Sequence, residues 1–439
     1  MHALCSTLLT GTPVLATGPG AAGIGGIPVE FILFALTLLG VALFHHRTFL
    51  VALLGMSAVT IYKLAFTGFK TGAGVAGFIG HLGHEWVTLA NLLCLLLGFA
   101  ILARHFEDSR APEILPRFLP DDWKGPFVLL AMVWGISSFL DNIAAAMIGG
   151  AMAHKLFAGK VHLGYLAAIV AASNAGGSFS VVGDTTTTMM WIAGVRPLAV
   201  FEAIIAAVVA LLISGIIAAK QQHAHHPITA NAGPGVTVDR GHLAIVGLIL
   251  LLAMGTNLAI NLLMPERSGV FPFIGVAVWV AILVTIPLRP HPWKVLREAL
   301  TGTFFLLFLV VTASMMPVEK LPAPSWQAAM SLGFVSAVFD NIPLTALAIQ
   351  QDGYDWGFLA FAVGYGGSIL WFGSSAGVAL STMYPEAKSA GRWLRHGWHV
   401  PLAYVVAFFA MLLVLKWHPE MIKQAPLPTT PANANKNPF

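Results

Sequence analysis

The sequence predicts an all-α polytopic membrane protein with about ten to twelve membrane segments, each of roughly 20 apolar residues. The chain is 57% hydrophobic and only 10% charged, whereas soluble domains carry about 25% charged residues. Apolar runs of suitable length recur along the whole chain. The clearest are Ile27–Phe44, Phe49–Phe66, Trp86–Leu102, Phe127–Gly149, Leu198–Ile217, Leu243–Met264, Phe271–Ile286, Phe304–Met316, Phe358–Phe372 and Pro401–Leu415.

Charge and cysteine content argue against several other classes of protein. The net charge of +4 is spread over short loops, which fits contact with anionic lipid headgroups rather than nucleic-acid binding. Cys5 and Cys94 are the only cysteines, too few for a disulfide framework or a cysteine zinc site. We therefore expect the protein to contact the lipid bilayer. We expect no nucleic-acid partner, no cofactor and no metal other than a transported ion.

Composition divides the chain into two membrane halves separated by a polar stretch rich in Pro, Gly, Asn and His. His223, His225 and His226 lie in this stretch, where a solvated loop is favoured over a metal site. We expect a flexible N-terminus at 1–26, a linker at 220–241 and a disordered tail at 418–439. The first membrane half is expected at 27–219, with a repeat core at about 84–219. The second is expected at 242–417, with a repeat core at about 291–417.

A Ser-x-x-x-Asp-Asn motif occurs once in each half, within an apolar run. It reads Ser137, Asp141 and Asn142 in the first half and Ser336, Asp340 and Asn341 in the second. This spacing predicts that serine and aspartate share one helix face. A carboxylate inside hydrocarbon costs about 2.5–3.5 kcal/mol, so its repetition indicates a function for both aspartates.

A Gly-rich segment follows each motif and predicts a broken helix, because each glycine weakens a helix by about 1 kcal/mol. The aligned glycines are Gly176, Gly177 and Gly183 in the first half and Gly366, Gly367 and Gly373 in the second. The Asp-Asn helices should break too, at Pro343 in the second half and through packing or Gly149-Gly150 in the first. Irregular backbone at membrane depth is tolerated only where it is buried in protein or lines a cavity.

Hydroxyl groups beside these breaks supply hard oxygen ligands, which suit Na⁺ or a proton better than a soft metal. They include Thr186 and Thr187 in the first half and Ser368 and Ser374 in the second. The alternative, that Gly-rich segments are only close-packing helix faces, accounts less well for two aligned copies. Glu85, Arg196 and Glu202 lie near expected segment ends, where an interfacial role is favoured.

The motif, followed by the stretch 174–192, resembles the NhaD-type sodium/proton antiporters of the ion transporter superfamily, which also holds arsenite permeases and dicarboxylate symporters. The resemblance covers about residue 85 to the last helix. It implies inverted repeats with re-entrant hairpins and broken helices, and commonly a homodimer. Carried over position by position, the implied ion-binding residues are Ser137, Asp141, Asn142, Asn174, Asp184, Thr186, Thr187, Ser336, Asp340, Asn341, Ser368 and Ser374.

The expected function is secondary active Na⁺ (or Li⁺)/H⁺ antiport by alternating access at a shared midplane site, in a bacterial inner membrane. The alternative is Na⁺- or H⁺-coupled transport of an anion such as citrate, another dicarboxylate or arsenite. The carboxylate-transporting relatives use paired Ser-Asn-Thr motifs, and the second position here reads Val363-Gly364-Tyr365, which favours the cation. An enzyme is not expected, since no nucleophile–base pair or metal cluster stands out. Asp184 aligns with Ser374, so the halves should contribute unequally.

Overall fold

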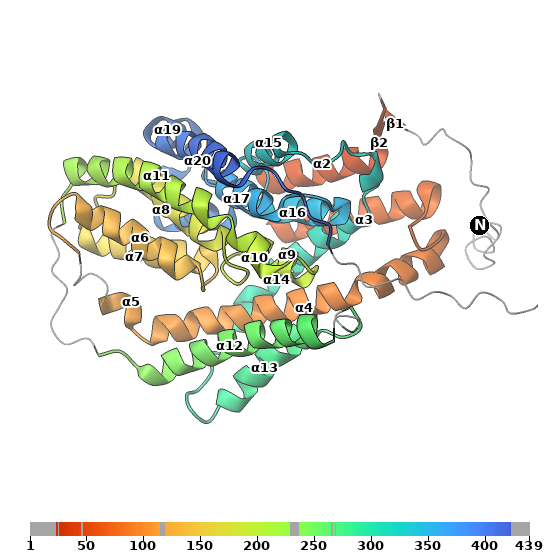
Figure 1. Ribbon diagram of the computed structural model, residues 1–439, viewed down its shortest axis with the longest axis horizontal. Coiled ribbons are helices and arrows are strands. Elements are labelled where there is room, and N and C mark those ends of the chain that lie inside the picture. The colour runs from red at the N-terminus through yellow and green to blue at the C-terminus, as the bar shows by residue number, and fades with distance from the viewer. Residues whose placement is uncertain are drawn as a thin grey trace, which may run out of the picture.

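The computed structural model describes residues 23–24, 26–44, 47–114, 119–228, 237–264, 267 and 269–422. Within these ranges the chain is almost entirely helical, and the one sheet is the short antiparallel pair β1 (Gly23–Ile24) and β2 (Ile27–Pro28). Most helices run along the long axis of the molecule (Figure 1). The predicted all-α class is confirmed.

Two groups of three helices, one from each half of the chain, form a scaffold. α4 packs against α12, α13 and α14, while α3 packs against both α2 and α14. Their bounds are α2 Val29–Leu43, α3 Thr48–Tyr62 with the π-turn η2 Lys63–Thr67, α4 Gly74–Asp108, α12 Arg240–Leu263, α13 Phe273–Thr285 and α14 Lys294–Ser314; the short α5 (Ala111–Ile114) follows α4.

The remaining helices form two units, each a hairpin, a broken helix and an outer helix. In the first unit they are α6 Lys124–Ser137, α7 Asn142–Leu156, α8 Leu163–Ser178, α9 Thr185–Ile192, α10 Pro197–Phe201 and α11 Ile204–His225. In the second they are α15 Trp326–Ser336, α16 Asn341–Gln351, α17 Trp356–Gly366, α18 Ser375–Met383, α19 Ala390–His396 and α20 His399–Leu415, with the short turns η5 Val318–Lys320 and η6 Pro385–Ala387.

The two units pack in the same way. α8 contacts α6, α7 and α11, and α17 contacts α15, α16 and α20. The units also interlock, because α9 reaches α16, α18 reaches α7, and α8 touches α17. Nearly every residue of α8 and every residue of α17 is buried. The two broken helices therefore lie at the centre of the protein.

Glycines permit the close approach of each broken helix to its hairpin. A Cβ atom on any of four glycines would collide with a backbone carbonyl: Gly176 with Trp134, Gly183 with Ser137, Gly366 with Gly333, and Gly373 with Ala337. None of the four has a positive φ. Glycine is thus required at these positions for space rather than for a left-handed backbone.

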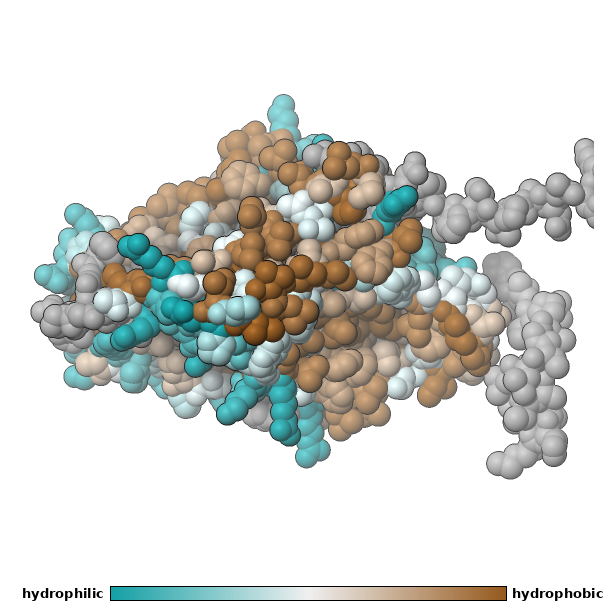
Figure 2. Space-filling view, turned by 90° about the horizontal axis from the view of Figure 1, so that it is seen from below, coloured by the Kyte–Doolittle hydropathy of each residue, from teal (hydrophilic) through white to brown (hydrophobic). Residues whose placement is uncertain are grey.

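Among the described residues, five helices are long and apolar enough to cross a membrane, or six if the bent pair α19 and α20 counts as one span. Four shorter apolar helices of 10–17 residues add to these: Val29–Val41, Lys124–Ser137, Phe273–Thr285 and Trp356–Gly366. Some of the predicted runs of about 20 residues are divided by backbone breaks. The predicted segment Phe127–Gly149, for example, is split between α6 and α7. Apolar side chains cover much of the surface (Figure 2). The protein is a multi-pass integral membrane protein.

Two expected boundaries differ in the structure. α11 continues to His225 because Gln222 is anchored: its side chain accepts from the backbone N–H of His162 at 2.7 Å and donates to the carbonyl of Lys160 at 3.1 Å. His223 and His225 are thus in a helix rather than a loop. Residues 418–422, expected to be disordered, pack against the protein, with the Glu420 N–H donating to the Tyr354 carbonyl at 3.0 Å. Residues 1–22 and 423–439 lie outside the described ranges.

Candidate functional site

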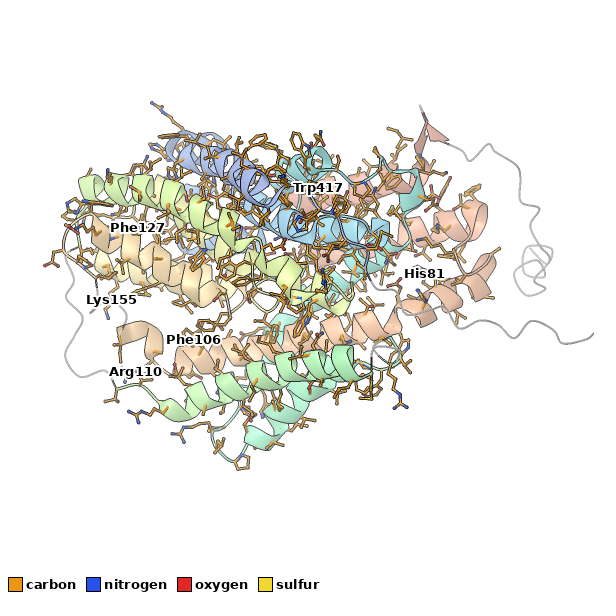
Figure 3. All side chains as sticks on the ribbon, in the orientation of Figure 1. His81, Phe106, Arg110, Phe127, Lys155 and Trp417 are labelled. Atoms are coloured by element: carbon orange, nitrogen blue, oxygen red, sulfur yellow. The ribbon has the colours of Figure 1, made fainter. Side chains whose placement is uncertain are left out.

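Each Ser-x-x-x-Asp-Asn motif forms the tip of a hairpin, and the serine closes the first helix. Ser137 Oγ donates to the Ser173 carbonyl of α8 at 2.6 Å, and Ser336 Oγ donates to the Val363 carbonyl of α17 at 2.7 Å. In the first unit the open end of the hairpin is marked by Phe127 and Lys155, which lie on the same side of the molecule (Figure 3). The serines therefore fasten both hairpin tips to the broken helices.

The aspartates of the motif begin the second helix of each hairpin. Asp141 accepts from the Ile143 N–H at 3.3 Å and Asp340 accepts from the Ile342 N–H at 3.1 Å, so each is an N-cap residue. The expectation that serine and aspartate share one helix face is wrong, because the helix ends between them.

The expected causes of the hairpin breaks also differ. Pro343 lies inside the first turn of α16, where its missing N–H costs no helical hydrogen bond. Gly149 and Gly150 lie within α7, packed against the side chains of Val133 and Leu380. The aspartate caps thus mark the breaks in both units.

The broken helices resume at capping residues that are equivalent in the two units. Asp184 caps α9, and its Oδ1 accepts from the Thr186 N–H at 2.8 Å and the Thr186 hydroxyl at 3.0 Å. Ser374 caps α18 by accepting from the Gly377 N–H at 3.3 Å. Gly176 and Gly177 lie in the last turn of α8, whereas Gly366 and Gly367 end α17. Gly183 and Gly373 lie within the breaks.

A buried hydrogen-bonded cluster joins the two units at these breaks. Asn142 Nδ2 donates to Asn174 Oδ1 at 2.9 Å and to Asp184 Oδ2 at 2.8 Å. Asn174 Nδ2 in turn donates to the hydroxyls of Ser368 at 2.9 Å and Ser374 at 3.1 Å. All five side chains are at most 5% exposed. Five of the residues selected from the sequence therefore meet in one place.

The second unit does not reproduce this cluster. Asn341, the counterpart of Asn142, is 3% exposed and its Nδ2 has no hydrogen-bond partner. The sequence explains this difference, because the second unit has Gly364 at the position of Asn174 and Ser374 at the position of Asp184. Asp340 instead accepts from the Ser375 hydroxyl at 3.0 Å. Ser375 is not among the ion-binding residues predicted from the sequence. Its position beside Ser374 in the Gly-rich segment is the sequence feature that points to it.

The hydroxyl of Thr187, like those of Ser137 and Ser336, donates to backbone carbonyls. It donates to the Ser180 carbonyl at 2.6 Å and to the Asp184 carbonyl at 2.9 Å. Thr187 therefore holds the shape of the break rather than facing Asn142 and Asn174.

The three aspartates carry no counter-charge: among the described residues, no salt bridge involves Asp141, Asp184 or Asp340. The carboxylate oxygens of the three residues also do not all lie within 4.8 Å of one another. An unpaired carboxylate in a low-dielectric site is costly, and either a proton or a bound cation relieves the cost. The candidate site is thus a set of polar side chains arranged around Asp184, with Asp141 and Asp340 at the two hairpin tips.

Two packed units with facing broken helices, joined by a buried polar cluster, define the class of the protein: a multi-pass membrane protein with transporter architecture. The chain is 26% identical over 344 residues to sodium/proton antiporter 1 of Arabidopsis thaliana, and the match covers 69% of this chain and 58% of that protein. It is 27% identical to sodium/proton antiporter 2 of the same plant, covering 68% of this chain and 76% of the relative.

Bacterial relatives give the same result. The chain is 26% identical over 400 residues to the Na⁺/H⁺ antiporter NhaD of Alkalimonas amylolytica, covering 76% of this chain and 78% of the relative. The resemblance to NhaD-type antiporters is thereby confirmed. No family model matches. Among solved structures, the YdaH transporter of Alcanivorax borkumensis matches with a TM-score of 0.45 and 14% identity, covering 88% of this chain and 98% of that chain.

Proposed function

We propose that the protein is a secondary active transporter that exchanges Na⁺ or Li⁺ for protons across a bacterial inner membrane. The observation that carries this proposal is the cluster in which Asn142 and Asn174 connect Asp184 of the first unit to Ser368 and Ser374 of the second. Carboxylate, amide and hydroxyl oxygens are the ligands preferred by hard cations.

Exchange follows from competition for one carboxylate. Asp184 Oδ2 already accepts from Asn142 at 2.8 Å and Oδ1 accepts from Thr186, so these donors offset part of the cost of burying the ionised form. A Na⁺ ion entering the cluster would take oxygen ligands from Asp184, Asn174 and the two serines. A proton on Asp184 would remove the charge that attracts the ion. The site therefore holds Na⁺ or H⁺, but not both, which is the requirement for antiport.

Alternating access requires the site to face each side in turn. The ligands come from both units, which contact one another through α8 and α17, α9 and α16, and α7 and α18. A shift of the two hairpin units, residues 124–225 and 326–415, against the scaffold of α2–α4 and α12–α14 would move the whole site together. We therefore propose the scaffold and the pair of hairpin units as the functional domains, in place of the two halves of the sequence. The proposal also includes an inverted topology of the two repeats and formation of a homodimer.

The test is Na⁺-dependent collapse of a respiration-driven pH gradient in everted vesicles from antiporter-deficient cells. Wild-type protein should respond to Na⁺ and Li⁺. Asp184→Asn, Asp141→Asn and Asp340→Asn should each abolish the response, whereas Asp122→Asn on the exposed α5–α6 loop should leave it intact. The proposal fails if wild-type protein gives no Na⁺ or Li⁺ signal from mildly acid to strongly alkaline pH.

The anion-transport alternative has less support from the geometry. The cluster holds the carboxylate of Asp184, with Asp141 and Asp340 at the hairpin tips, and among the described residues no Lys or Arg pairs with any of the three. An anion would need positive charge to offset these carboxylates. Radiolabelled citrate uptake in the same vesicles separates the two functions. The curated relatives are named as antiporters, in keeping with a protein that is not an enzyme.

A further inference from the structure

A second cluster of ligand-type side chains shares no residue with the proposed ion site. Glu202 at the end of α10, Asp355 at the start of α17 and His418 after α20 each offer one ligand atom within 4.8 Å of the other two. His418 Nε2 lies 3.0 Å from Glu202 Oε2, and His418 Nδ1 lies 3.0 Å from Asp355 Oδ2. Three segments far apart in the sequence thus converge on one point.

Other contacts hold the segment that carries His418 in place, independently of its imidazole. Trp356 Nε1 donates to the Glu420 carbonyl at 2.8 Å, and the Ile422 N–H donates to Asp352 Oδ1 at 2.9 Å. Arg196 forms an ion pair with Glu420. Trp417, which is labelled in Figure 3, packs against Phe358 of α17 with ring centroids 5.6 Å apart. The imidazole is therefore positioned beside the carboxylates before any ligand binds.

The cluster combines a buried ligand with accessible ones. The Asp355 side chain is 2% exposed, while those of His418 and Glu202 are 43% and 34% exposed. A cavity of about 280 Å³ is lined by Trp356, which follows Asp355 in the chain, and by Glu420, which is in the same segment as His418. The exposed His418 and Glu202 side chains leave the cluster open to an ion and to water that completes its coordination.

We propose that Glu202, Asp355 and His418 form a binding site for a divalent transition-metal ion of the zinc type. One imidazole and two carboxylates make a three-ligand set that leaves a fourth tetrahedral position for water. Tetrahedral bonds of 2.0–2.2 Å place ligand atoms about 3.3 Å apart. The ligand atoms lie within 4.8 Å of one another, so small side-chain rotations suffice. The bound ion fastens the chain after α20 to α10 and α17.

The experiment is zinc titration of the full-length, tag-free protein in detergent, in competition with a chromophoric chelator. Wild-type protein should bind one Zn²⁺ that is lost or weakened at least about tenfold in His418→Gln, Glu202→Gln and Asp355→Asn, since even the partners of metal ligands contribute ten- to 100-fold to affinity. Asparagine at 355 retains the oxygen that caps α17. Mg²⁺ should not displace the zinc, because imidazole is a poor ligand for it.

Two matched variants and a stability measurement separate this site from background binding by other histidines. His84→Gln and Glu386→Gln, both at exposed positions, should keep the zinc. Zn²⁺ should raise the thermal unfolding midpoint of wild-type protein and of these controls, but not that of His418→Gln. The proposal is overturned if wild-type protein and His418→Gln bind equal amounts of zinc with equal affinity, or if His84→Gln loses the same ion.

Discussion

Asn174 of the first unit donates to the hydroxyls of both Ser368 and Ser374 of the second unit, at 2.9 and 3.1 Å. Its amide oxygen meanwhile accepts from Asn142, so one side chain links the two units through the proposed ion site. The counterpart of Asn174 in the second unit is Gly364, which has no side chain that could form the equivalent hydrogen bonds to the first unit. The first unit alone therefore supplies the amide side chain that connects the two units at this site.

Replacing Asn174 should damage both stability and transport. Asn174→Ala leaves Asn142, Ser368 and Ser374 with fewer partners in a buried site, and an unsatisfied buried polar group costs about 1–3 kcal/mol. We expect a lower thermal unfolding midpoint in detergent and loss of Na⁺-dependent exchange. Ser375→Ala, which removes only the contact to Asp340, should lower the midpoint less. Normal exchange by Asn174→Ala would contradict the assigned site.

The two motif asparagines should respond differently to the same substitution. Asn341 has an unpartnered buried amide nitrogen, so Asn341→Leu should leave stability unchanged or raised, since a buried unpaired polar group is itself costly. Asn142→Leu breaks two hydrogen bonds and should destabilise the protein. If Asn341 supplies an ion ligand, Asn341→Leu will nevertheless lose Na⁺ exchange. Thermal unfolding and vesicle assays on both variants distinguish these effects, and unaltered exchange by Asn341→Leu would remove that residue from the site.

Glycine-to-alanine changes test the close packing of the broken helices. Gly176→Ala and Gly366→Ala would each press a methyl group onto a hairpin carbonyl, and overpacking costs about 1–3 kcal/mol. Gly135→Ala in α6 meets open space and should be neutral or stabilising by about 0.5–1 kcal/mol, through the higher helix propensity of alanine. Unfolding midpoints measured side by side check this. Equal midpoints for all three variants would show that the carbonyl contacts do not constrain the fold.

Competition between Na⁺ and H⁺ predicts a specific pH dependence of exchange. If one proton and one Na⁺ share Asp184, acidification should raise the apparent KM for Na⁺ by up to about tenfold per pH unit, by mass action. The maximal rate at saturating Na⁺ should change less. Initial rates measured across a Na⁺ series at several pH values test this. A KM independent of pH would mean that the proton and the ion occupy separate sites.

Much of the site was predictable from local patterns. Intramembrane Asp141 and Asp340 are conspicuous because charge is rare in apolar runs, and the duplicated glycines reveal the repeat because each copy needs the same close approach. The details of the hairpin tips were less predictable. The sequence predicts breaks at Pro343 in the second half and through packing or Gly149-Gly150 in the first. The aspartate caps mark the breaks instead, because a side-chain acceptor for free N–H groups starts a new helix.

The sequence by itself determined that the protein is helical and membrane-embedded, that it is built from two related units, and which polar residues interrupt its apolar runs. These properties follow from composition, spacing and repetition along the chain. Only the tertiary structure decided that Asn174 binds the serines of the other unit, that Asn341 has no partner, and that His418 lies between Glu202 and Asp355. Such relationships depend on how segments some 200 residues apart pack together, and local sequence patterns carry no record of that packing.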